Sequence, residues 1–322
     1  MLTIWTNAQF DEAAHAQLLE GVAPHRLLFS TQLSASNLAK AAPDPALGEA
    51  DAAFGQPDPG MALQCHRLRW IHLTTAGYTR YDTGAFREGF GGRGAQLTNS
   101  SQVYAEPCAE HVFAFMLSQA RQLPASQETQ RTDRAWPTLP RRAISRLLLG
   151  QSVVLLGFGA IGHRLAEMLA PFHMRITAVR RRPSGDENVR VVTEDQLEAA
   201  LADADHVVNI LPENPATIAF VNGPRLAAMK PGAVFYNVGR GTTVDQDALL
   251  AALRSGHLAA AHLDVTNPEP LPPEHPLWTA PNCHITPHTA GGHDTEQMRL
   301  VGHFLHNLRR FDRGEELADR VI

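Results

Sequence analysis

An apolar segment that runs into a glycine-rich turn and then into an amphipathic segment constrains the fold of this chain most. It reads SVVLLGFGAIGHRLAEML over residues 152–169. Gly157, Gly159 and Gly162 have the G-x-G-x-x-G spacing of a strand–turn–helix unit that binds a dinucleotide. The first glycine permits the tight turn, the second lets a pyrophosphate approach the backbone, and the third lets the helix pack close to the strand. The sequence therefore predicts a nucleotide site, with a structural turn that binds nothing as the alternative.

The residues that follow the second predicted strand of this unit bear on the choice of nucleotide. NAD-binding units usually place an Asp or Glu about 20 residues after the glycines, where it receives the ribose hydroxyls. Here the strand RITAV, residues 175–179, ends in Arg180, Arg181 and Arg182, and the first acid is Asp186. A guanidinium suits a 2′-phosphate because it offers a permanent charge and two parallel donors. We expect NADP to be preferred and NAD to be possible; the alternative is a solvated basic turn.

Length and composition exclude several classes of protein. The 322 residues are enough for two domains with separate cores. A net charge of −5 gives no reason to expect nucleic acid or an anionic membrane as a partner. No apolar run is long enough to span a bilayer, and the first residues lack the pattern of a secretion signal. The three cysteines are widely spaced, as in free thiols of a reducing compartment, so we expect a cytoplasmic protein without a metal site.

Strand-like and helix-like segments alternate along the chain, which is typical of parallel sheets covered by helices. In the first hundred residues we predict the strands LTIWT, RLLFS, DAAF, WIHLT and AQLTN, and helices over 9–19, 33–40 and 57–63. A long helix over 102–123 leads through a polar stretch to six strands, 152–156, 175–179, 206–211, 233–238, 259–263 and 283–286, with helices between them. A last helix over 293–313 has no strand partner, so we expect it to pack on the N-terminal domain.

Three candidate catalytic residues follow three strands of the predicted nucleotide-binding sheet. Arg240 lies between Gly239 and Gly241, while Glu269 and His288 follow the last two strands. Ligands of such sheets bind at the carboxyl ends of the strands. An arginine there can hold a carboxylate and polarise a carbonyl, and a histidine oriented by a carboxylate can protonate an alkoxide. Together they favour reduction of a 2-keto acid, although each alone could be a surface, solvated or helix-capping residue.

At these residues the chain resembles the D-isomer-specific 2-hydroxyacid dehydrogenases. The similarity covers nearly the full length, through LLGFGAIG, YNVGRGTTVDQDAL, HLDVTNPEPLP and NCHITPHTAG. The resemblance implies that Arg240 binds substrate, that Glu269 pairs with His288, and that His288 is the acid–base residue. By the same resemblance, the backbone around Ala76 and Gly77 in TTAGYTRYD holds the substrate carboxylate.

The resemblance also extends the predicted cofactor site. It implies that the N–H groups of Ala160 and Ile161 meet the pyrophosphate and that Asp264 contacts the nicotinamide end. The complete set that we predict for the cofactor is Gly157, Gly159, Ala160, Ile161, Gly162, Arg180, Arg181, Pro212 and Asp264.

The family fold implies an α/β chain of two doubly wound parallel-sheet domains. A Rossmann nucleotide-binding domain, residues 100–290, is inserted into a flavodoxin-like substrate domain formed by 1–99 and 291–322. Members generally form homodimers through the nucleotide-binding domain, and the helix around 102–121 would belong to that contact. We expect a reductase of small 2-keto acids such as glyoxylate or hydroxypyruvate. The alternatives are a phosphoglycerate- or phosphite-type dehydrogenase of the same family, and a non-catalytic NAD(H)-sensing protein of the corepressor type.

Overall fold

The computed structural model describes residues 1–34, 42–183, 185 and 187–322. Most of the helix predicted over 33–40 lies outside the described residues, and so does Asp186. The chain forms two compact units. Unit 1 consists of Met1–Tyr104 and Gly292–Ile322, and unit 2 consists of Ala105–Gly291. Each unit contains its own parallel sheet.

Unit 1 is built on a five-stranded parallel sheet in the order β2-β1-β3-β4-β5. This is the flavodoxin-like order that the sequence predicts. The strands are β1 Thr3–Ala8, β2 Arg26–Ser34, β3 Ala52–Phe54, β4 Trp70–His72 and β5 Gln96–Thr98. The helices are α1 Glu12–Gly21, α2 Pro59–Gln64, α3 Gly84–Gly89 and α11 Glu296–Arg313.

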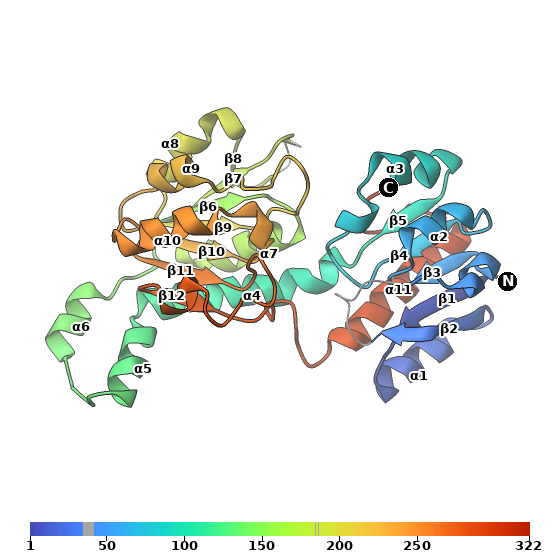
Figure 1. The fold of residues 1–322 in the computed structure, drawn as a ribbon, viewed down its shortest axis with the longest axis horizontal. Helices are drawn as coiled ribbons and strands as arrows, with labels where there is room; N and C mark the ends of the chain where they lie inside the picture. Colours follow the sequence, from blue (N-terminus) through green and yellow to red (C-terminus); the bar gives the residue numbers. More distant parts are fainter. Residues whose placement is uncertain (35–41, 184, 186) are drawn as a thin grey trace. The chain divides into compact units, whose positions relative to one another are not determined.

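Helices cover both faces of this sheet because neighbouring strand residues point to opposite sides. Ile4 and Trp70 lie in the core shared with α1 and α11, whereas Trp5 and Ile71 lie in the core shared with α2 and α3. Figure 1 shows these four helices around the sheet. The last helix thus completes the core of unit 1, since Phe304 of α11 is fully buried against β3 and β4.

Unit 2 is built on a seven-stranded parallel sheet in the order β12-β11-β10-β9-β6-β7-β8. Its strands are β6 Ser152–Leu156, β7 Arg175–Val179, β8 Arg190–Val192, β9 His206–Asn209, β10 Val234–Asn237, β11 Ala260–Leu263 and β12 Cys283–Ile285. The helices around it are α7 Ala160–Leu169, α8 Leu197–Ala202, α9 Gly223–Ala228 and α10 Gln246–Arg254. β6 is the first strand of this sheet along the chain, and later strands are added on both of its sides. The strand order therefore reverses between β6 and β9, and the carboxyl ends of these two strands flank that point.

Two sequence predictions for unit 2 are wrong. The sheet has a seventh strand, β8, which was not predicted because its three residues form an edge strand with a single neighbour, β7. The long helix predicted over 102–123 ends early: α4 spans Ser101–Ala120, and α5 begins at Leu123. Gln122 between them has φ +58°, a left-handed conformation that no α-helix continues through. The predicted polar stretch contains α5 Leu123–Arg131 and α6 Thr138–Ile144.

Single turns of 3₁₀ helix also connect the elements. They span Pro45–Glu49, Thr79–Tyr81, Gly91–Arg93, Ala170–Phe172, Glu194–Gln196, Gly241–Thr243 and Pro276–Thr279. The turn Gly241–Thr243 follows β10 directly and begins next to Arg240, so it helps to set the position of a predicted site residue.

Candidate active site

The glycine turn lies at the carboxyl end of β6, where the strand order reverses. Gly157 has φ +97°, which residues with a side chain rarely adopt. A Cβ at Gly162 would lie 3.3 Å from the carbonyl oxygen of Gly157, so α7 packs closely against the turn. Gly159 is the N-cap of α7 and contributes no side-chain cap, which leaves the first N–H groups of the helix, those of Ala160 and Ile161, for an anion. The turn therefore fits a pyrophosphate.

The end of β7 lies directly beside this turn. The N–H of Gly157 donates to the carbonyl of Val179 at 3.2 Å, and Arg180 is the next residue. Nη1 of Arg180 lies 2.5 Å from Oε1 of Glu187, while Arg181 is exposed. Sequence reasoning did not find Glu187, because a carboxylate seven residues after a strand carries no recognisable signal.

The turn that carries Arg240 is held by two close backbone contacts. A Cβ at Gly239 would lie 2.7 Å from the carbonyl oxygen of Leu211, and one at Gly241 would lie 1.9 Å from that of Thr266. Only glycine fits at either position, because backbone atoms cannot move aside as a flexible side chain can. The two glycines thus press the Arg240 turn against the loops that follow β9 and β11.

Hydrogen bonds from buried polar side chains also hold the Arg240 turn in place. The amide of Asn209 donates to the Asn237 side chain at 2.9 Å and to the Thr243 hydroxyl at 2.7 Å. Asn237 and Thr243 in turn donate to the carbonyl of Arg240, at 3.2 and 2.6 Å. All three side chains are almost completely buried. The sequence did give a signal, since Asn209 and Asn237 each end an apolar strand, but we did not predict their role.

Glu269 and His288 form a direct pair. Nδ1 of His288 donates to Oε2 of Glu269 at 2.8 Å, and Oε1 of Glu269 accepts the N–H of Thr266 at 3.0 Å. Burial would raise the pKa of Glu269, but the hydrogen bond and charge of His288, the Thr266 N–H and the charge of Arg240 hold that pKa below its usual value. The carboxylate is therefore ionised at neutral pH, and Arg240 lies close enough for its charge to act on it.

Asp264 organises the loop that presents His288. Its carboxylate accepts the Thr286 hydroxyl at 2.6 Å and the N–H groups of Thr289 and Ala290, both at 2.9 Å. Its carbonyl accepts the N–H of His288 at 2.8 Å. His288 itself has φ +53°, a conformation that costs a non-glycine residue free energy and persists only where the surroundings impose it. Asp264 supplies those surroundings.

The remaining predicted cofactor residue of unit 2, Pro212, lies in the loop after β9. It is exposed, and its carbonyl accepts the Thr217 hydroxyl at 2.6 Å. His111 of α4 is a residue that the sequence did not single out. Its Nε2 lies 3.1 Å from the Thr286 hydroxyl and 3.8 Å from the Asp264 carboxylate.

The predicted carboxylate-binding loop lies in unit 1, after β4. The carbonyl of Thr75 accepts the Ser100 N–H at 3.0 Å, that of Ala76 accepts the Asn99 amide at 2.7 Å, and that of Gly77 accepts the Thr75 hydroxyl at 2.6 Å. Within a planar peptide the carbonyl and the following N–H point in opposite directions. The N–H groups of Ala76 and Gly77 therefore face away from these partners, as in an anion-binding loop.

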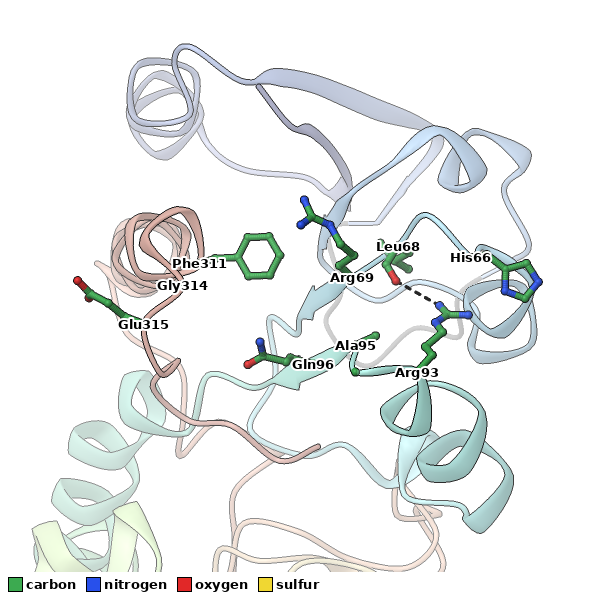
Figure 2. A pocket seen from close by; sticks show the side chains of 10 residues that line it. His66, Leu68, Arg69, Arg93, Ala95, Gln96, Phe311, Gly314 and Glu315 are labelled. Atoms are coloured by element: carbon green, nitrogen blue, oxygen red, sulfur yellow. Dashed lines mark hydrogen bonds between the residues drawn. The ribbon is translucent and has the colours of Figure 1, made fainter.

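A cavity of about 530 Å³ lies elsewhere in unit 1, where β4 and β5 begin. Figure 2 shows Arg69, Gln96 and Phe311 around it, with Arg93 donating to the Leu68 carbonyl. No predicted site residue lines this cavity. The loop after β4 leaves the sheet at the other end of that strand, so the cavity is separate from it.

Among the described residues, two other features are absent: a cluster of metal ligands and a helix that could span a membrane. No three His, Cys, Asp or Glu side chains in this part of the chain lie close enough together to hold a metal ion. In the same part of the chain, every helix is too short or too polar to cross a bilayer.

Comparison with known proteins agrees with this geometry. Residues 113–290 match the family described as D-isomer specific 2-hydroxyacid dehydrogenase, NAD binding domain. The chain is 33% identical to a glyoxylate reductase of Pyrococcus furiosus over 77% of its length and 74% of that protein. It is 36% identical to the glyoxylate reductase/hydroxypyruvate reductase of Homo sapiens over 71% of its length and 70% of that protein.

A solved structure extends the similarity to the whole chain. The D-isomer specific 2-hydroxyacid dehydrogenase from Xanthobacter autotrophicus Py2, in complex with NADPH and MES, is 27% identical, with a TM-score of 0.82 over 100% of this chain and 98% of that one. The chain belongs to the D-isomer-specific 2-hydroxyacid dehydrogenase family. It is an NAD(P)-dependent oxidoreductase of 2-hydroxy acids.

Proposed function

We propose that this enzyme reduces small 2-keto acids, such as glyoxylate or hydroxypyruvate, and prefers NADPH to NADH. The observation that carries the proposal is the Glu269–His288 pair at 2.8 Å, held at the carboxyl edge of the sheet with the charge of Arg240 acting on it. The names of the Pyrococcus furiosus and human relatives support the choice of keto acid.

Each of the three residues has a distinct role in this proposal. Arg240 binds the substrate carboxylate and polarises the keto group, because a guanidinium offers charge and paired donors. His288 protonates the developing alkoxide, and Glu269 orients the imidazole through their hydrogen bond. Bound NADPH or NADH supplies the hydride. We also propose that the N–H groups of Ala76 and Gly77 bind a carboxylate, which their orientation favours.

The cofactor residues fit a nicotinamide dinucleotide. Gly157, Gly159 and Gly162 allow the pyrophosphate to approach the N–H groups of Ala160 and Ile161. Asp264 would contact the nicotinamide end, Pro212 would also contact the cofactor, and Arg180 and Arg181 would contact the 2′-phosphate of NADPH. The NADPH in the Xanthobacter structure supports this preference.

A homodimer is also part of the proposal. Six of the twelve exposed large apolar side chains of the described residues fall within 123–149, in and around α5 and α6: Leu123, Trp136, Leu139, Ile144, Leu147 and Leu149. Trp136 is 92% exposed and Leu139 77%. Apolar side chains gathered in this way usually mark a protein–protein contact. Light scattering should give twice the chain mass of 35.1 kDa. The double variant Trp136→Asp with Leu139→Asp should give a monomer. A cytoplasmic location is also part of the proposal, since the three cysteines are widely spaced along the chain.

The enzymatic proposal is tested with a panel of 2-keto acids against NADPH and NADH, scored by kcat/KM. We expect glyoxylate or hydroxypyruvate with NADPH to give the highest value.

Arg240→Ala should raise KM for the keto acid and lower kcat, since it removes both carboxylate binding and carbonyl polarisation. Arg180→Asp together with Arg181→Ala should shift preference from NADPH toward NADH. Equal losses with both coenzymes would show that these arginines do not read the phosphate, and a panel without turnover would refute the proposal.

A further inference from the structure

Arg180, at the edge where the ribose of a bound nucleotide is expected, already has a carboxylate partner. Nη1 of Arg180 lies 2.5 Å from Oε1 of Glu187, and Oε2 of Glu187 accepts the N–H of Gly185 at 2.8 Å. The Glu187 side chain is only 2% exposed, whereas Arg180 is 29% exposed. A backbone donor and a guanidinium thus hold this carboxylate in one place.

Arg180 lies next to the nucleotide turn through the pairing of β6 and β7. Leu156 is in register with Val179, and the next residues along the two strands are Gly157 and Arg180. Arg180, the partner of Glu187, therefore follows the strand end next to the glycine turn, on the side of β7. This is the side on which doubly wound folds bind the adenosine ribose.

We propose that Glu187 determines coenzyme choice by competing with the 2′-phosphate of NADPH for Arg180, so that the enzyme accepts NADH more readily than the three arginines alone predict. This inference rests on the proposed function, because it concerns the nucleotide that the proposed reaction uses. The arginine run 180–182 predicts a preference for NADP with NAD possible, but one of its charges is already paired with a carboxylate of the chain.

Electrostatics give the competition its direction. A 2′-phosphate and the Glu187 carboxylate are both anions, so each disfavours the other at a shared guanidinium. If Arg180 turned fully to the phosphate, Glu187 would be left as a buried charge without that partner, which is strongly unfavourable. Arg181 and Arg182 are exposed and remain available to the phosphate. A ribose with a free 2′-hydroxyl carries no charge and meets no such penalty, and a carboxylate can accept its hydrogen bond.

The test uses two nucleotide fragments that differ only in the group at issue, adenosine 2′,5′-bisphosphate and 5′-AMP, with affinities measured by calorimetry. Glu187→Gln keeps the side-chain shape and an acceptor for the Gly185 N–H but removes the charge. We expect it to bind the bisphosphate about five- to tenfold more tightly than the wild type, with the affinity for 5′-AMP changed less than about twofold.

Two further variants make the result specific. Glu198→Gln removes an exposed charge from α8, so it should leave both affinities unchanged. In an Arg180→Ala background, Glu187→Gln should give no gain, because the contested guanidinium is absent. Melting curves confirm that each variant folds.

Unchanged or weaker binding of the bisphosphate by Glu187→Gln would overturn the inference, and so would a gain that persists without Arg180. The probes contain no nicotinamide, so the outcome does not depend on turnover. A chain that behaved as expected here but reduced no keto acid would contradict the proposed function alone.

Discussion

At the scale of single residues, the site depends on a histidine held in an unfavourable backbone conformation by a buried aspartate. His288 combines φ +53° with a 2.8 Å hydrogen bond to Glu269. On its proposed role, His288→Gln removes the proton donor and keeps a polar side chain of similar size. We expect kcat to fall by about a hundredfold to ten-thousandfold, with nucleotide affinity changed less than about twofold. Steady-state kinetics and nucleotide titration check both, and a variant with wild-type kcat across neutral pH would exclude His288 as the acid.

Gly241 gives a second residue-scale prediction, about the backbone. A Cβ there would lie 1.9 Å from the Thr266 carbonyl oxygen and 2.6 Å from the Asn267 nitrogen. Gly241→Ala must therefore displace the Arg240 turn or the Glu269 loop, and we expect a loss of at least about 2 kcal/mol in the free energy of unfolding together with most activity. Gly223→Ala is the matched control, because its nearest neighbour would be the Ala248 Cβ at 3.7 Å. Urea denaturation compares the two; equal stabilities would contradict the packing argument.

At the scale of elements, the sequence predicted strands well where burial makes them uniformly apolar. All five residues of β6 are buried, and its bounds match the predicted 152–156. β8 was missed because an edge strand of three residues has too little pattern to separate it from a loop. α5 and α6 were missed because they are short, at nine and seven residues, and have too few apolar residues to show a helical periodicity.

The candidate site likewise contains residues that a short sequence segment predicts and others that only the folded structure shows. Arg240, Glu269 and His288 were predictable because each follows a strand within a distinctive segment. Asn209 was not, since its contacts join segments 28 and 34 residues apart in the sequence. Glu187 was not either, because a carboxylate a few residues after a strand is not distinctive. Chemistry that depends on such contacts is visible only once the sheet order is known.

An element-scale feature that the sequence did not predict is a row of stacked rings across the strands of unit 2. His262 on β11 lies 5.3 Å from the Tyr236 ring on β10 and 4.7 Å from the His284 ring on β12. Burial, and then the nearby His284, His111 and His206, lower the pKa of His262 to about 3. Neither of its ring nitrogens has a hydrogen-bond partner among the described residues. His262 is therefore uncharged in the folded chain at neutral pH, and its ring nitrogens form no hydrogen bond with the described residues.

This row predicts acid sensitivity with a definite sign. The unfolded chain protonates His262 below about pH 6.5, whereas the folded chain does not until about pH 3, so stability falls as the pH drops through that window. His262→Phe should remove up to about 1.4 kcal/mol of that loss per pH unit and be neutral or stabilising at pH 7. Urea denaturation at pH 7, 5.5 and 4.5 measures the slopes, with the exposed His306→Gln as control. Parallel slopes for His262→Phe and the wild type would contradict the prediction.

At the scale of the whole molecule, each unit has a core of its own, and this predicts two separable responses. Phe304 of α11 is fully buried in unit 1, with its ring 4.2 Å from that of Phe54 and 5.3 Å from that of Trp70. Phe304→Ala should destabilise unit 1 by about 3–5 kcal/mol. Phe235 is the matched residue in the core of unit 2.

Calorimetry with and without NADPH distinguishes the unfolding of unit 1 from that of unit 2. The nucleotide stabilises only the unit that binds it, by an amount that grows with the logarithm of its concentration over Kd. We expect Phe304→Ala to lower a transition that NADPH does not raise, and Phe235→Ala to lower the transition that NADPH does raise. A single transition that moves with either substitution and with NADPH would mean that the two cores unfold together. In that case α11 and the Rossmann sheet would act as one cooperative body, because loss of either core would then unfold the whole chain.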